Sequence, residues 1–385
     1  MQVSAQRQRP GLPGTVIEDE FLIPGGIESS GLFAQLRQFF AHDRVVNLLM
    51  VATIIIGFFH GWLKIRFRAQ WVTFAFDLPL TAAWLVTVAT VGRGRRLFPD
   101  CNMSRVLIAL TVVGIVYILL PFGVPLVIGI ASFRAWCFIP LIFLIGYHIT
   151  RSVRQIEVYL WLLTILGLVT SFYGVFMQST EDVLEIMRRD PELQFRLSNQ
   201  FYADSHGIGT LRRFSTFVSA ASFGGMMAYC TTFAVSRLVH PGCSWPERIF
   251  LGVTGCLMSY GIVLSGSRSA MISLLVGLGF AVWYRRGGMV LVLAPVLIGV
   301  GLVLGVSTLG GGAADRFSTL FDPEVLLQRL YIVAAPGLES LVQYPMGGGL
   351  GRSGHGVPVI MYTSERQADF RMIDGDMGQI GRAHV

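Results

Sequence analysis

Long uninterrupted runs of apolar residues constrain this chain most strongly. Inside a lipid bilayer each backbone N–H and C=O group needs an internal partner, so such a run crosses as a helix of about 20 residues. Measured against that length, the sequence predicts about nine helices, over residues 45–62, 71–91, 106–130, 134–149, 156–177, 214–237, 248–264, 270–284 and 289–309. Pro121 and Pro125 should kink or end the third. We therefore expect an all-α polytopic membrane protein with a helix bundle over residues 45–309.

The composition supports a membrane protein and gives no sign of a nucleic-acid partner. The 385 residues are 53% hydrophobic and only 14% charged, with a mean hydropathy of +0.61, whereas soluble domains carry about 25% charged residues. The net charge of +7 comes from arginine, because Lys64 is the only lysine. Membrane proteins collect such charge in cytoplasmic loops, so it does not require nucleic acid. The five cysteines show no paired spacing, and we expect neither a metal site nor a disulfide.

The arginines of the short loops predict the orientation of the helices. They cluster at 93–105, 151–154, 237–248 and 285–286, which fall on one side of a nine-helix bundle and mark it as cytoplasmic. The tail 1–44 then lies inside, and two long loops, about 178–213 and 310–379, face the periplasm. Lys64, Arg66 and Arg68 contradict this pattern. Either the first two helices are drawn wrongly or these charges have a role beyond topology.

Two further features concern single residues and the end of the chain. Asp77 lies in an apolar run, where a carboxylate is a functional candidate, but pairing with Arg66, Arg68 or water is the simpler account. Residues 380–385 match the translation of a common sequencing adapter. We expect them to be non-native and the chain to be truncated at its C-terminus after about Gln379.

Leu264-Ser-Gly-Ser-Arg-Ser-Ala270 forms a turn of small residues between two apolar segments, with Arg268 in it. Small residues leave backbone N–H groups accessible, and a guanidinium can bind an anion through two parallel hydrogen bonds. We interpret the turn as the edge of an anion site at a membrane surface. The alternative is an interfacial turn whose arginine extends to lipid headgroups.

A second motif, Arg212-Arg-Phe-Ser-Thr-Phe-Val-Ser-Ala-Ala-Ser-Phe-Gly224, places Arg212 and Arg213 at the predicted outer end of a helix. The serine, alanine and glycine residues that follow permit close helix packing, so this helix should be central in the bundle. The simpler reading is that the paired arginines only anchor the helix end.

The second long loop supplies further candidates. Asp322-Pro-Glu predicts a helix start, with Asp322 as N-cap and Arg329 on the helix. Residues 345–356 form a glycine-rich loop that contains Arg352 and His355. The spacing G-x-G-x-x-G within it lacks the strand–turn–helix context of a dinucleotide site, but such a loop can surround an anion with backbone N–H groups.

Three residues of this loop can carry a proton. His355 is the first candidate, although a lone loop histidine is often idle. Asp374 and Asp376 are the others, because a carboxylate beside arginines stays ionised and can orient or deprotonate a hydroxyl. Their alternative is a solvated acidic turn.

Together the motifs resemble the O-antigen ligase and polymerase superfamily. Arg-Phe-Ser-Thr-Phe with Ser-Phe-Gly, then Leu-Ser-Gly-Ser-Arg-Ser-Ala, then Tyr-Pro-Met-Gly-Gly-Gly-Leu-Gly occur in that order over residues 212–379. The resemblance implies a glycosyltransferase without metal or cofactor. Its donor would be an undecaprenyl-diphosphate-linked glycan at the periplasmic face of the bacterial inner membrane, and its acceptor another glycan or a lipid.

The resemblance also assigns roles to residues. Arg212 or Arg213 and Arg268 would bind the diphosphate, with Arg329 and Arg352 as further candidates. Asp374 or Asp376 would stand where ligases present a histidine, which favours a polymerase, although His355 would partly restore that role.

Two other functions remain open from the sequence. A transporter or flippase for an anionic, lipid-linked solute would use the same arginines, but would place polar groups near mid-membrane on broken helices. A receptor-like scaffold would leave the arginine pattern unexplained.

Overall fold

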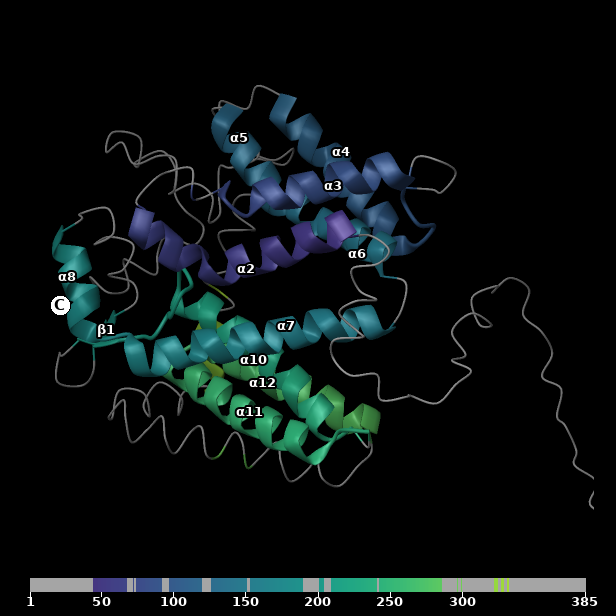
Figure 1. Cartoon of the computed structure of the whole chain (residues 1–385). Coiled ribbons are helices and arrows are strands. Elements are labelled where there is room, and N and C mark those ends of the chain that lie inside the picture. Colours follow the sequence, from purple (N-terminus) through teal and green to yellow (C-terminus); the bar gives the residue numbers. More distant parts are fainter. Residues whose placement is uncertain are drawn as a thin grey trace, which may run out of the picture.

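The computed structural model of the chain is predominantly helical (Figure 1). It describes residues 44–67, 72, 74–91, 97–119, 126–150, 153–189, 201–203, 209–240 and 242–285, together with 296, 299, 322–324, 327, 328 and 331. The elements, in order, are α2 (Arg44–Phe67), α3 (Asp77–Val91), α4 (Asn102–Leu119), α5 (Leu126–Phe133), η2 (Arg134–Phe138), η3 (Ile139–Leu141), α6 (Ile142–Ile149), α7 (Val153–Phe172), η4 (Tyr173–Met177), α8 (Thr180–Arg189), β1 (Phe201–Ala203), β2 (Gly209–Leu211), α10 (Ala220–Leu238), α11 (Trp245–Ser265) and α12 (Arg268–Arg285).

Four helices of the described part are long and apolar enough to cross a membrane. They are α2, α4, the segment Gln155–Met177 that joins α7 to η4, and α11. The segments Asp77–Thr90, Ile139–Ile149 and Arg268–Ala281 are also apolar but shorter. The chain is therefore a helical membrane protein, as its composition predicts.

Several predicted boundaries are wrong. The third predicted helix ends at Leu119 rather than at residue 130, before Pro121 as that proline predicts, and the fourth begins at Leu126 rather than at Arg134. Segments α5, η2, η3 and α6 follow one another with right-handed helical backbone angles at their junctions, and η2 is a π-helical turn. The helix predicted from Phe214 begins only at Ala220, because residues 214–219 bond to other helices instead.

Helix α10 lies at the centre of the larger core, as its small residues predict. It contacts α7, α11 and α12, and its buried residues include Phe223, Met227 and Ala234. A Cβ atom at Gly224 would collide with the Ser265 hydroxyl and press on Ala270. The missing side chain therefore lets α10 approach the turn between α11 and α12.

The helix ends follow capping rules. Ser219 caps α10, with its Oγ accepting a hydrogen bond from the Ser222 N–H at 3.1 Å. Ser244 and Glu247 form a capping box at the start of α11. Gly266 ends α11 in the left-handed conformation, with φ 59°, which glycine adopts without steric cost.

Helices α2, α3 and α6 share a second core. Asp77, the first residue of α3, has a different partner from the one predicted. Asp77 pairs with Arg134 at 2.5 Å, rather than with Arg66. The guanidinium of Arg134 also lies over the rings of Phe74 and Phe76, at 5.3 and 4.7 Å from their centroids. Both side chains of the pair are mostly buried from solvent, which is consistent with a structural role for Asp77.

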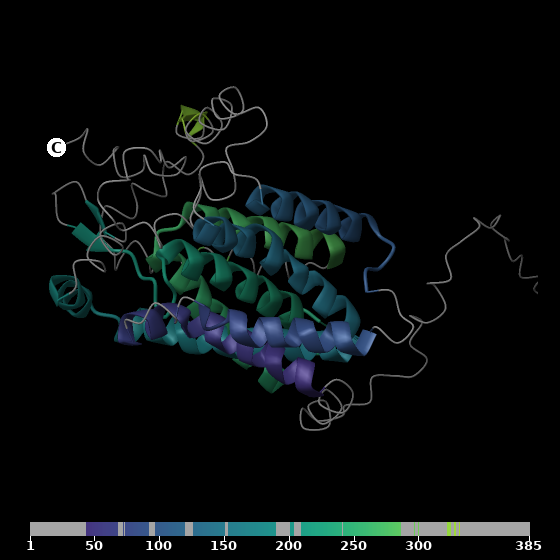
Figure 2. The ribbon, with the colours of Figure 1, turned by 90° about the horizontal axis from the view of Figure 1, so that it is seen from above.

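The first long loop contains regular structure that the apolar pattern does not predict. Helix α8 packs the apolar side chains of Val183, Ile186 and Met187 against Leu211 and Phe214. Strands β1 and β2 pair as an antiparallel hairpin, with Phe201 opposite Leu211. Both views place α8 and the hairpin at the same end of the bundle (Figures 1 and 2).

Candidate functional site

The second arginine motif and the small-residue turn meet in the structure. The Arg213 backbone N–H donates to the Leu264 carbonyl, and Arg212 Nε donates to the Ser265 carbonyl, both at 3.0 Å. Helix α12 begins three residues after Ser265, at Arg268. Three of the predicted anion-binding residues thus belong to a single hydrogen-bonded unit at one end of the bundle.

Arg213 carries a charge that no described residue balances. Its side chain is half-buried, and Nη1 is buried with no hydrogen-bond acceptor among the described residues. Burial lowers the pKa of the guanidinium, an effect that the neighbouring Tyr260 opposes. Because arginine stays protonated at any physiological pH, the result is a cation with a buried donor that an anionic oxygen would satisfy.

The turn that carries Arg268 is ordered by its serines. The Ser265 hydroxyl donates to the Ile262 carbonyl at 2.6 Å and accepts from the Ser267 N–H at 3.2 Å. The Ser267 hydroxyl in turn accepts from the Ala270 N–H at 3.4 Å. These bonds fix the start of α12, where the positive end of the helix dipole adds to the charge of Arg268.

Thr216 fixes the arginine motif to α2. Its hydroxyl donates to the Phe58 carbonyl at 2.6 Å, and its carbonyl accepts from the Trp62 N–H at 3.0 Å. Phe58 and Trp62 are one helical turn apart, so Thr216 lies against the backbone of that turn. A Cβ atom at Gly61 would collide with the Phe217 backbone, and glycine is therefore required for this approach.

Ser215 and Gln178 fix the same segment to α7 and its π-helical end. Ser215 has the left-handed φ of 53°, which costs free energy in a residue other than glycine. Its hydroxyl donates to the Thr170 carbonyl at 2.5 Å. Gln178 Oε1 accepts from the backbone N–H groups of Phe214 and Ser215 at 3.1 and 3.0 Å. Such a strained, heavily bonded segment is typical of functional sites.

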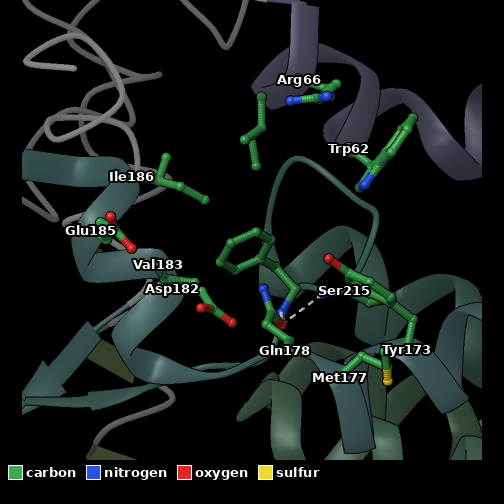
Figure 3. A pocket seen from close by; sticks show the side chains of 12 residues that line it. Trp62, Arg66, Tyr173, Met177, Gln178, Asp182, Val183, Glu185, Ile186 and Ser215 are labelled. Carbon is green, nitrogen blue, oxygen red and sulfur yellow. Dashed lines mark hydrogen bonds between the residues drawn. The ribbon is translucent and has the colours of Figure 1, made fainter. Parts of the chain in front are cut away.

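A cavity of about 520 Å³ adjoins this segment (Figure 3). Its polar lining comes from the end of α2, the π-helical end of α7, α8 and the segment after Arg213, and includes Arg66, Tyr173, Gln178, Asp182 and Glu185. Figure 3 shows Arg66 and Trp62 on one side of the cavity and Asp182 on the other. Arg66, whose charge contradicted the topology rule, thus lines a polar cavity.

The other predicted site residues lie outside the described part of the chain. These are Arg329, Arg352, His355, Asp374 and Asp376. The predicted helix start before Arg329 is confirmed, because the Glu324 N–H donates to Asp322 Oδ1 at 3.0 Å. Within the described residues, no group of three or more His, Cys, Asp or Glu side chains could hold a metal ion.

Sequence reasoning identified the arginines but missed the residues that position them. Ser215, Thr216 and Gln178 act through backbone groups far away in the sequence, and no local pattern indicates such bonds. The sequence does contain one hint. The run Phe-Ser-Thr-Phe places two adjacent hydroxyl side chains in an apolar segment, and this segment is not helical in the structure.

Comparisons with models of protein families, with curated proteins and with solved structures find no match for this chain. The resemblance to the O-antigen ligase and polymerase superfamily therefore stays a prediction from motif order.

Proposed function

We propose that this protein is a membrane glycosyltransferase of the O-antigen polymerase or ligase type. It transfers a glycan from an undecaprenyl-diphosphate donor to a glycan or lipid acceptor. We also propose that about nine helices span the bacterial inner membrane. The arginine unit, which consists of Arg212, Arg213 and the turn of Arg268, then faces the periplasm. The acceptor base is then one of Asp374, Asp376 and His355, with Arg329 and Arg352 as further anion-binding residues.

The buried, unmatched donor of Arg213 is the observation that carries this proposal. Leaving a buried charged donor without an acceptor costs free energy, and such a cost is tolerated where a ligand removes it. Arg212 bonds to the turn that leads into Arg268, so the joined segments carry three arginines. A diphosphate, with several anionic oxygens, matches clustered guanidinium groups.

The chemistry of transfer explains why rigid arginines would be needed. As the bond between the anomeric carbon and the diphosphate oxygen breaks, negative charge develops on the leaving diphosphate. Fixed donors that already point at that charge lower the barrier, by about 3 kcal/mol for one such donor. Ser215 donates to α7 and Thr216 to α2, while Gln178 Oε1 accepts from the Phe214 and Ser215 N–H groups, and these bonds provide the rigidity.

A transporter or flippase for an anionic lipid would also use arginines, but at other positions. It would place them midway along broken helices. Arg212 and Arg213 lie in the connection between β2 and α10, and Arg268 is the first residue of α12. The mid-helix charge of Arg134, at the broken segment η2, is instead paired with Asp77.

The proposal is tested in a host that makes lipid-linked repeats but lacks its own polymerase. The protein and its Arg213→Gln variant are expressed, and the lengths of surface and lipid-linked glycan are compared on a gel. We expect a ladder with the wild type and single repeats with the variant at equal expression. Single repeats that reach the surface with the wild type but stay on undecaprenol with the variant would assign a ligase, and an unchanged ladder would refute the proposed role of Arg213.

Arg105→Gln is the matched control for that experiment. Arg105 is exposed on α4 and pairs with Asp100 at 2.8 Å, so its substitution removes one positive charge outside the arginine unit. The control should give the wild-type ladder.

A further inference from the structure

We propose that the cavity between α2, α7 and α8 binds the sugar rings of the acceptor. This inference rests on the proposed function and adds the binding site of the acceptor glycan to it. The cavity of about 520 Å³ falls within the range of roughly 300–1,000 Å³ that is typical of small-molecule sites. It is therefore large enough for a saccharide and far larger than a site for a single ion.

The polar groups of the cavity match a polyhydroxyl ligand. Asp182 supplies an anionic acceptor, whereas Arg66 supplies guanidinium donors. Each sugar hydroxyl donates one hydrogen bond and accepts others, so it can use both kinds of group. A diphosphate would be repelled by the Asp182 carboxylate, which separates this cavity chemically from the arginine unit.

Gln178 points independently to a ligand in the cavity. It is only 7% exposed, and its Oε1 is occupied by the two backbone N–H groups of Phe214 and Ser215. The amide nitrogen has no hydrogen-bond acceptor among the described residues. Gln178 lines the cavity, so its amide nitrogen can donate to an oxygen of a sugar bound there.

Two aromatic side chains complete the match. Trp62 and Tyr173 line the cavity from α2 and from the π-helical turn η4, and Figure 3 shows them on the side opposite α8. Aromatic rings provide rigid apolar surface with a polar edge, which suits the C–H faces of a sugar ring.

The cavity also lies where an acceptor must bind. Phe214 and Ser215, the two residues after Arg213, form part of its lining. Asp182 sits in the first turn of α8, where Ser179 Oγ accepts from the Asp182 N–H at 3.0 Å. A glycan held here presents its hydroxyl groups next to the segment that carries the donor-binding arginine.

The test measures binding of the free repeat oligosaccharide, released from the host's lipid-linked glycan by mild acid, to the purified protein. Asp182→Asn keeps the shape of the side chain and removes its charge. We expect binding about tenfold weaker than in the wild type, because a hydrogen bond to a charged group is lost. Equal affinity in Asp182→Asn and the wild type would overturn the assignment.

Glu181→Gln is the matched control, because Glu181 lies on the same turn of α8 but does not line the cavity. It should bind the oligosaccharide like the wild type, and a loss equal to that of Asp182→Asn would overturn the proposal. Displacement of the oligosaccharide by equimolar glycerophosphoethanolamine would assign the cavity to lipid headgroups and overturn it as well.

The two proposals fail separately in these measurements. Arg213→Gln should leave binding of the free oligosaccharide unchanged, since that ligand carries no diphosphate, yet abolish the glycan ladder. Oligosaccharide binding with an unaffected Arg213→Gln ladder would reject the transferase mechanism and keep the cavity. A ladder that depends on Arg213 but not on Asp182, without oligosaccharide binding, would reject the cavity and keep the mechanism.

Discussion

Two half-buried arginines at opposite ends of α10 show how differently this protein treats the same charge. Arg237, near the end of the helix, has a side chain that is 22% exposed and pairs with Glu247 at 2.9 Å and Glu157 at 3.5 Å. Arg213, before the start of the helix, has a buried Nη1 for which no described residue is an acceptor. Described residues of the protein match the charge of Arg237, whereas none of them accepts a hydrogen bond from Nη1 of Arg213, which we propose a ligand does.

The backbone is regular around Arg237 and strained around Arg213. Arg237 belongs to a regular helix, and its partner Glu247 also closes the capping box of α11. Arg213 is followed by a non-helical segment that contains the strained Ser215. The Arg213 end combines strain with an unmatched donor, whereas Arg237 is paired, although Nε of the nearby Arg248 is also buried without a partner among the described residues. The strain at Ser215 therefore supports the proposal that the Arg213 end is the functional one.

The largest expected effect is on transfer activity in Arg213→Gln. Loss of one fixed donor should slow transfer by roughly 100-fold or more, while the thermal midpoint in detergent changes little, because no described residue accepts a hydrogen bond from the removed Nη1. Activity is measured as glycan elongation per folded protein. A variant that instead melts early would show that Arg213, like Arg237, is structural.

The reverse result is expected for Arg237→Gln. Removing it leaves Glu247 and Glu157 without their cation, and because the pair is neither fully buried nor exposed we expect a loss of about 1–3 kcal/mol in the free energy of unfolding. Activity per folded protein should stay at the wild-type level. Scanning fluorimetry gives the stability, and a large drop in specific activity would break the contrast between the two ends.

Gly61→Ala tests the close approach between α2 and the arginine motif. The new Cβ would meet the Phe217 backbone, and such overpacking should cost about 1–3 kcal/mol. Gly57→Ala is the control on the same helix, since nothing lies within 4 Å of a Cβ there; it should be neutral or stabilising. Equal melting of the two variants would contradict the observed packing.

Thr216→Val should have the smallest effect. It keeps the side-chain shape but removes the hydroxyl that satisfies the Phe58 carbonyl, at a cost of about 1 kcal/mol. Thr232→Val is the control, because the Thr232 hydroxyl only donates to Ala228, one turn earlier in its own helix, at 2.8 Å. If Thr216 positions Arg213, its variant also transfers more slowly, whereas the control does not.

The helices could be predicted because their signal is local. Apolar runs and caps indicate most of the helical segments, and the small residues of α10 correctly predict its central position. The order of the predicted spans also places Arg213 and the turn of Arg268 on the same side of the membrane. In each case neighbouring residues, or the simple alternation of spans and loops, carry the information.

The features that could not be predicted depend on partners distant along the chain. Helix α8 is amphipathic and only ten residues long, so it does not stand out among apolar runs. The Arg134–Asp77 pair joins residues from different predicted helices. The non-helical conformation of residues 214–219 follows from bonds to α2, to α7 and to the side chain of Gln178, which outweigh the local apolar pattern that predicted a helix there.

The most direct test of the account is binding of undecaprenyl diphosphate to the purified protein in detergent. The measurement compares the wild type, Arg213→Gln and, as a charge-matched control, Arg237→Gln. We predict that Arg213→Gln binds at least about tenfold more weakly and that folded Arg237→Gln binds like the wild type. Equal affinity in the wild type and Arg213→Gln would contradict the central claim, because the unmatched donor of Arg213 would then not be a diphosphate site.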